Sequence, residues 1–272
     1  MVRLPENTVL RAGVFMVLAM GSFVTNDTLI KLVGNSLPVG EIIMVRGVIA
    51  MAFIGLICAW QGVLGNLPLL RSRYVLLRTT LDLIATILFI MALMHMPIAN
   101  ITAVMQVVPL AVALLSALVL RERIGLGRMV AIVVGFLGVL LIVKPTPANF
   151  TIYDVFALLI VLAVAVRDIA TRRIPARIPT FLIALANAAF VTAGGAALCA
   201  VQGFTMPDAW QLGTLALAAV FLACGYLFMV TTLRLGDLSA TAPFRYSIML
   251  FAIVYGILVF GEYPDWLAMS GM

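Results

Sequence analysis

Long apolar segments separated by short polar breaks run through the chain and restrict what it can fold into. A membrane-spanning helix needs about 20 mostly apolar residues, and only a helix satisfies its own backbone hydrogen bonds over such a segment. Nine segments approach this length, at residues 12–33, 38–60, 74–94, 99–120, 127–143, 154–172, 179–200, 209–231 and 240–260, and a tenth begins near Trp266. The sequence therefore predicts an all-α polytopic membrane protein.

The composition agrees with a membrane protein and argues against several other classes. Hydrophobic residues make up 64% of the chain and charged residues 10%, against about 25% charged residues in soluble domains. The net charge is +6, but the basic residues lie in short loops rather than on one face, so we expect no nucleic-acid partner. The sequence has no Gly-rich phosphate loop, metal-ligand cluster or nucleophile beside a base. We therefore expect no cofactor, no metal and no enzymatic activity.

The distribution of basic residues predicts the orientation of the chain. With a cytoplasmic N-terminus, twelve basic residues fall on the cytoplasmic side and two on the opposite side, as expected from the excess of positive charge in cytoplasmic loops. The twelve are Arg3, Arg11, Arg71, Arg73, Arg78, Arg121, Arg123, Arg128, Arg172, Arg173, Arg177 and Arg234, and the two are Lys31 and Lys144.

Similar residues recur at a nearly constant spacing in the two halves of the chain. Pairs 141 residues apart are Asp27 and Asp168, Lys31 and Arg172, and Pro38 and Pro179, while Glu122 and Glu262 lie 140 apart. This offset indicates the duplication of a five-span unit, which we place at residues 1–146 and 147–272. Because five is odd, the second copy enters the membrane inverted. Two inverted five-helix repeats, ten spans in all, are typical of secondary transporters.

The repeat also predicts that the tenth span is truncated in this chain. The fifth span ends near Lys144, so its counterpart is expected to reach about position 284, whereas the sequence ends at Met272. A truncated reading frame, a fragment and a natural nine-span variant are the alternatives. A non-transporting membrane remnant is the corresponding alternative for function.

Three segments resemble the drug/metabolite transporter superfamily, specifically its ten-span EamA-type members. They are "NDTLIKLV", "VVGFLGVLLIVKP" and "SATAPFRYSIMLFAIVYGILVFGEYPD". Within that family the chain is similar to bacterial S-adenosylmethionine uptake transporters, and riboflavin importers are similar too. The resemblance implies an inner-membrane secondary active transporter that alternates access around a central cavity lined mainly by spans 1, 3, 4, 6, 8 and 9.

The same resemblance implies a small organic metabolite as the solute. We expect an S-adenosylmethionine-like solute or another zwitterionic or aromatic one, and the alternative is a riboflavin-type vitamin importer or a metabolite exporter. The lipid bilayer is the second partner, and a proton or a counter-substrate is the expected coupling partner.

Six ionisable residues lie well inside the predicted spans, where each costs at least about 2.5 kcal/mol and therefore suggests a functional role. They are Asp27, Arg46, Asp82, Arg167, Asp168 and Arg245. Three charges of each sign favour mutual pairing in the empty protein and a zwitterionic or neutral solute in the loaded one. A membrane enzyme acting on lipid would instead gather its polar residues at one membrane face. The repeat-related Asp27 and Asp168 are the candidates for coupling to a proton.

Asp27 has two candidate partners. It lies about 9 Å from the outer end of span 1, and Arg46 lies about 12 Å into span 2 from the same side, so the two side chains can meet. The alternative is Lys31, one helical turn after Asp27 on the same face. Asp168 has the same choice of Arg172, four residues on.

The partners of the other charged residues are less evident. Asp82 follows Arg78 by one turn near the cytoplasmic end of span 3, which favours an interfacial pair. Arg167 adjoins Asp168, but neighbours in a helix diverge by about 100°, so Arg167 is expected to need a separate partner.

Uncharged polar residues complete the predicted site. Gln106 in span 4 aligns with Tyr246 in span 9, and Tyr226 lies in span 8, so these groups are expected near the repeat axis. Arg245 lies about 8 Å inside span 9 and either snorkels to the interface or faces the bundle. The predicted substrate-binding residues are Asp27, Arg46, Gln106, Asp168, Tyr226, Arg245 and Tyr246.

Overall fold

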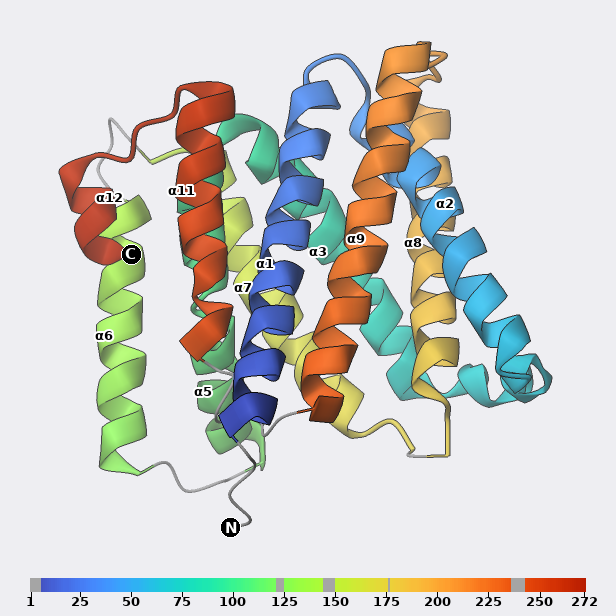
Figure 1. Cartoon of the computed structure of the whole chain (residues 1–272), viewed down its shortest axis with the longest axis horizontal. Coiled ribbons are helices and arrows are strands. Elements are labelled where there is room, and N and C mark those ends of the chain that lie inside the picture. Colours follow the sequence, from blue (N-terminus) through green and yellow to red (C-terminus); the bar gives the residue numbers. More distant parts are fainter. Residues whose placement is uncertain (1–5, 121–124, 144–149, 176, 236–242) are drawn as a thin grey trace.

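The protein is a bundle of helices that run alternately up and down (Figure 1). The computed structural model describes all residues except 1–5, 121–124, 144–149, 176 and 236–242. The elements of the described part are α1 (Glu6–Gly34), α2 (Val39–Trp60), the 3₁₀ helix η1 (Val63–Arg71), α3 (Arg73–His95), α4 (Ile98–Met105), α5 (Val108–Leu120), α6 (Leu126–Val143), α7 (Ile152–Arg172), α8 (Thr180–Gln202), α9 (Ala209–Leu235), α11 (Ser247–Phe260) and α12 (Trp266–Gly271). No strand occurs among these residues.

Within the described part of the chain, seven helical segments are long and apolar enough to cross a membrane. They lie at residues 10–34, 39–60, 73–95, 98–118, 180–202, 209–229 and 243–260, and a shorter apolar helix covers Met129–Val143. The 21-residue α7 coincides with the sixth predicted span and carries four charged residues, Asp154, Arg167, Asp168 and Arg172, in a mostly apolar sequence. The prediction of an all-α membrane protein with many spans is confirmed.

Prolines and capping residues separate successive helices. Pro38, Pro97 and Pro179 stand directly before α2, α4 and α8. Because proline has no amide hydrogen and cannot continue a preceding helix, it favours a new helix start at these positions. At the start of α7, the backbone N–H and the hydroxyl of Thr151 both donate to the Asp154 carboxylate.

The fourth predicted span is broken, which corrects the expectation of one continuous helix over residues 99–120. The amides of Gln106 and Val107 bond three residues back, to Ala103 and Val104, rather than four. Pro109 explains the break, since it has no amide for the carbonyl of Met105 and its ring clashes with that carbonyl. Tyr246, the repeat counterpart of Gln106, also lies at an interruption, because its amide bonds to the carbonyl of Pro243 three residues back.

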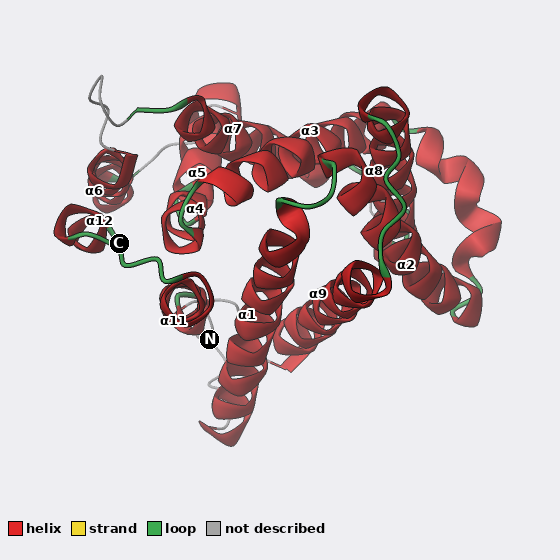
Figure 2. Ribbon diagram, turned by 90° about the horizontal axis from the view of Figure 1, so that it is seen from above, coloured by secondary structure: helices red, strands yellow, loops and turns green. Residues whose placement is uncertain are grey.

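The helices pack in the same pattern in both halves. The most extensive pairs are α1 with α9, α2 with α8, and α3 with α7. Exchanging the two predicted repeats turns the α1–α9 pair into the α7–α3 pair and returns the α2–α8 pair to itself. Seen from above, α3, α5 and α7 lie on one side and α1 and α9 on the other, with α2 and α8 at one end and α6 and α12 at the other (Figure 2).

Glycines allow α2 and α8 to approach closely. A Cβ atom on Gly40 would lie 2.5 Å from the backbone nitrogen of Cys199, and one on Gly195 would lie 2.8 Å from that of Met44. Small residues at such crossings let two membrane helices gain van der Waals contact. Arg46 lies on α2 two residues after Met44 and therefore beside this close contact between α2 and α8.

Candidate functional site

Charged side chains from four helices come together inside the bundle. We call them, together with Tyr226 of α9, the central charge cluster; its charged members are Asp27 of α1, Arg46 of α2, Asp82 of α3, and Arg167 and Asp168 of α7. Arg46 interacts electrostatically with Asp27, Asp82 and Tyr226, and Tyr226 does so with Asp82 and Arg167. The long apolar helices around the cluster place these charges where only partners or water stabilise them.

One half of the cluster is tightly paired. Arg167 ion-pairs with Asp82 through one terminal nitrogen, and its other terminal nitrogen lies 2.8 Å from Asp168 Oδ1. Its Nε also donates to Asp168 Oδ1 at 2.9 Å. The second oxygen of Asp82 accepts from the side-chain amide of Asn187 on α8. This paired half links α3, α7 and α8.

One prediction about these residues is wrong, and a second is confirmed in part. Asp82 pairs with Arg167 and not with Arg78, whose Nε instead donates to the Thr171 hydroxyl at 3.0 Å. Arg167 has the separate partner that the sequence predicts, Asp82, but it also binds its neighbour Asp168, because a guanidinium on three methylene groups can bend back where the helix alone would separate the two Cβ atoms. Arg172, the alternative partner of Asp168, contacts the Ser116 hydroxyl at 3.4 Å.

The other half of the cluster is loosely connected. Asn26 Nδ2 donates to Asp27 Oδ1 at 2.8 Å, and Arg46 Nη1 donates to Asn26 Oδ1 at 3.4 Å. Arg46 forms no ion pair with any carboxylate of the described residues. The Asn26 amide thus stands between an anion and a cation that do not touch each other. Asn26 was not predicted as a site residue, because an uncharged side chain in a span gives a weaker sequence signal than the charged Asp27 beside it.

Tyr226 faces the charges from α9. Its side chain is 57% exposed, although it interacts electrostatically with groups on α2, α3 and α7. Its ring packs edge-to-face against Phe23 of α1, with the ring centroids 5.5 Å apart. Tyr226 thus places an exposed aromatic ring within electrostatic reach of the charged members of the cluster.

Lys31 pairs at the end of the bundle instead of within the cluster. Its Nζ lies 2.5 Å from Glu262 Oε1 and donates to the carbonyl of Met96 at 2.6 Å. The second oxygen of Glu262 accepts from the amide of Ile98, at the start of α4, at 2.9 Å. Lys31 is thus not the partner of Asp27, and that alternative is wrong. The Lys31–Glu262 pair ties α1 to the start of α4 and the end of α11.

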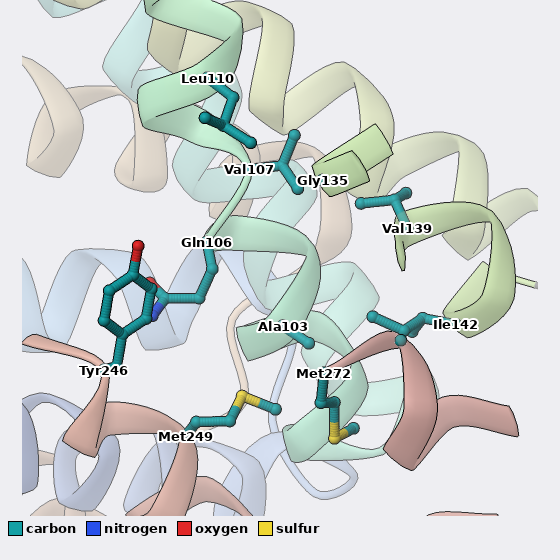
Figure 3. Close-up of a pocket in the computed structure, with 11 residues that line it drawn as sticks. Ala103, Gln106, Val107, Leu110, Gly135, Val139, Ile142, Tyr246, Met249 and Met272 are labelled. Carbon is teal, nitrogen blue, oxygen red and sulfur yellow. The ribbon is translucent and has the colours of Figure 1, made fainter. Parts of the chain in front are cut away.

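Gln106 and Tyr246 lie at a separate pocket (Figure 3). Its volume is about 370 Å³, and it lies between α4, α5, α6, α11 and α12. Both side chains project from the two helix interruptions toward one another, with Met249 beside them. Nothing from the central charge cluster lines this pocket. The structure therefore divides the predicted site residues between two places.

Arg245 belongs to neither place. It is exposed at the start of the last long apolar helix and forms no ion pair or hydrogen bond with the described residues. Arg245 therefore forms no pair with a buried aspartate of the described residues. A side chain that extends to the membrane interface is the alternative that agrees with the structure. Without Arg245 the central charge cluster holds two cations and three anions, so the predicted balance of three charges of each sign does not hold for it.

The described residues offer several ways to bind a small polar molecule but none to bind a metal. No group of three His, Cys, Asp or Glu side chains in the described part is placed to hold a metal ion. The cluster instead offers a guanidinium, a carboxylate, an amide and a phenol, whose donors and acceptors can bind a charged or hydrogen-bonding solute.

The chain is similar in sequence to known membrane transporters. The sequence model of the EamA-like transporter family matches residues 10–144 and again residues 151–272. The pseudopaline exporter CntI of Pseudomonas aeruginosa is 29% identical over 268 residues, covering 96% of this chain and 92% of the exporter. The S-adenosylmethionine uptake transporter of Rickettsia prowazekii is 27% identical over 169 residues, covering 62% of this chain and 57% of that transporter.

A further transporter and one solved structure are also similar to this chain. The riboflavin transporter of Brucella anthropi is 26% identical over 185 residues, covering 65% of this chain and 64% of that transporter. One solved crystal structure has a TM-score of 0.63 at 18% identity and covers 98% of this chain and 94% of its own. This last likeness shows the fold alone.

Proposed function

This chain belongs to the EamA-like transporter family, and we propose that it moves a small organic solute across a bacterial inner membrane by alternating access around the central charge cluster. The observation that carries the proposal is the meeting of Asp27, Arg46, Asp82 and Arg167 inside an apolar bundle. Charges at such depth are costly and are retained mainly where a solute or ion passes. Tyr226 adds an exposed aromatic surface beside them.

The two charges of the loosely connected half support a zwitterionic solute. Arg46 and Asp27, the two members of the cluster that form no ion pair with the described residues, carry one charge of each sign, which a solute with both a carboxylate and an ammonium group can match. A relative named for S-adenosylmethionine uptake agrees with a solute that carries both an ammonium group and a carboxylate, since S-adenosylmethionine has both. A riboflavin-type import, suggested by the relative from Brucella anthropi, is the second candidate because Tyr226 and Phe23 offer aromatic surfaces.

A solute screen tests the proposal. Purified protein reconstituted into proteoliposomes is loaded with unlabelled S-adenosylmethionine, riboflavin or an amino-acid mixture, and entry of the matching labelled solute by counterflow is measured. We expect entry above that of protein-free liposomes for at least one solute. Equal entry in both, for every solute tested, contradicts transport and favours a non-transporting role.

Asp27 is the leading candidate for proton coupling, with the repeat-related Asp168 as the second. Asp168 already shares Arg167 with Asp82, whereas Asp27 forms no ion pair with the described residues, receives a hydrogen bond from the Asn26 amide and interacts with Arg46 only at a distance. We expect Asp27→Asn to abolish accumulation against a gradient while sparing exchange at equal, saturating concentrations on the two sides. Accumulation with an unchanged pH profile in this variant assigns Asp27 a structural role and favours uniport or exchange.

A further inference from the structure

The two halves of the central charge cluster differ in how far the protein satisfies its own charges. Arg167 is bound by two carboxylates, whereas Arg46 ion-pairs with none in the described part of the chain. Asp27 receives a single hydrogen bond, from the neutral amide of Asn26. A charge removed from water is stabilised by opposite charge and by hydrogen bonds. The loosely connected half therefore has the most to gain from an incoming molecule.

The Asn26 amide shows what kind of group fits between Arg46 and Asp27. Its oxygen accepts from the Arg46 guanidinium at 3.4 Å, and its nitrogen donates to the Asp27 carboxylate at 2.8 Å. The amide thus turns an acceptor toward the cation and a donor toward the anion, without carrying charge itself. A carboxylate and an ammonium group on one carbon atom present the same two functions in charged form. Charge-assisted hydrogen bonds of this kind are about twice as strong as neutral ones.

We propose that Arg46 and Asp27 bind the α-aminocarboxylate head group of the solute, with the carboxylate on Arg46 and the ammonium group on Asp27. The head group displaces the Asn26 amide, which makes Asn26 a positioning residue that keeps the two charges apart in the empty protein. This inference rests on the proposed transport function and specifies the class of solute that the function requires.

The remainder of the solute has an aromatic surface available. Tyr226 interacts electrostatically with Arg46 and is 57% exposed, and Phe23 of α1 packs against the edge of its ring. An apolar or aromatic body attached to the head group therefore reaches the two rings. The ion pairs around Arg167 stay intact in this proposal and link α3, α7 and α8.

The first experiment removes groups from the probe and leaves the protein unchanged. Binding to purified protein in detergent is measured by the shift in thermal unfolding, for each of the common L-amino acids and for S-adenosyl-L-methionine. Each probe that binds is compared with its amine, which lacks the carboxylate, and with its acid, which lacks the ammonium group. We expect at least one probe to bind and the loss of either group to raise Kd at least tenfold, which is about 1.4 kcal/mol.

The second experiment assigns the two groups to residues. In Arg46→Gln the probe and its amine should bind equally, and in Asp27→Asn the probe and its acid should do so. Asn26→Asp places a fixed carboxylate beside Arg46, so the probe should weaken while its amine does not. Arg73→Gln and Asp208→Asn are matched controls, since both residues lie at the ends of helices and outside the cluster. Each comparison is a ratio within one variant and is therefore independent of how much of that variant folds.

Three results would overturn this inference. One is equal binding of every probe and its amine by the unaltered protein, which requires no variant to fold. The second is a probe-to-amine ratio that Arg46→Gln leaves unchanged. The third is the absence of binding by every probe while proteoliposomes take up riboflavin, which has no such head group; transport then stands and the proposed head group does not. Failure of transport for all solutes would instead remove the function on which the inference rests.

Discussion

Arg167 satisfies two carboxylates from two helices with one guanidinium. Its partners Asp82 and Asp168 are 17% and 40% exposed, and Arg167 itself is 25% exposed. Removing one member of a buried ion pair is costly mainly because the remaining charge loses its partner. The three residues are therefore not equivalent, since Arg167 is the only member that both others contact in this group.

We expect Arg167→Gln to destabilise the protein by about 3 kcal/mol, because it leaves two facing carboxylates without a cation. Asp168→Asn should cost much less, since Asp82 keeps its ion pair with Arg167 and Asp168 is partly exposed. Thermal unfolding of both variants in the same detergent measures the difference. Equal losses in the two variants would show that Arg167 does not join the two carboxylates in the folded protein.

Arg245 is expected to tolerate lysine. It is exposed and unpaired within the described part of the chain, so a second long cation should reach the same interface. Uptake by Arg245→Lys, normalised to the folded protein in the membrane, should stay within about twofold of the unaltered protein. A tenfold loss, about 1.4 kcal/mol, would show that the planar guanidinium itself binds a partner.

At the scale of elements, the positions of the helices could be predicted and their rotations could not. Hydropathy and prolines predict where spans begin and end, and α2, α3, α8 and α9 start within two residues of the predicted positions. The side on which Asp27 or Lys31 points depends on packing between distant helices, and Lys31 meets a residue 231 positions away. The break beside Gln106 had a local signal in Pro109, which the hydropathy of residues 99–120 concealed.

The Lys31–Glu262 pair should couple α1 to α4 and α11 energetically. Lys31 is 9% exposed and Glu262 is 23% exposed, and Glu262 also accepts from the amide of Ile98. We expect Glu262→Gln to cost about 2 kcal/mol of stability, as for a hydrogen bond to a charged group.

Adding Lys31→Met to this change should restore part of the loss, because no unpaired charge then remains buried. Thermal unfolding of the two single variants and the double variant gives the coupling. Strictly additive losses would mean that the two side chains do not interact in the membrane.

At the scale of the whole molecule, the helices pack in the same pattern in both halves, as the predicted repeat requires. The family model matches the chain twice, and the α1–α9 and α3–α7 pairs are equivalent under exchange of the halves. The boundary between residues 146 and 147 remains a prediction. The candidate site residues depart from the symmetry, since Arg46 on α2 corresponds to Asn187 on α8. Such a departure is what a site for an asymmetric solute requires.

The orientation of the whole bundle is predicted with the N-terminus in the cytoplasm. The starts of α3 and α9 lie at opposite ends of the bundle (Figure 1), and Ser72 and Asp208 directly precede these two starts in the sequence. In a variant free of other cysteines, a cysteine at position 208 should react with a membrane-impermeant maleimide added to intact cells. A cysteine at position 72 should react only after the inner membrane is opened. The reverse pattern would invert the orientation.

The central claim is that the charges inside the bundle bind the transported solute, and Arg46 tests it most directly. The measurement is counterflow of a labelled solute that the unaltered protein transports, in proteoliposomes containing equal amounts of the folded Arg46→Gln or Arg73→Gln protein. The account predicts that Arg46→Gln lowers entry at least tenfold at subsaturating solute, about 1.4 kcal/mol, while Arg73→Gln transports as the unaltered protein does. Equal entry through both variants would contradict it.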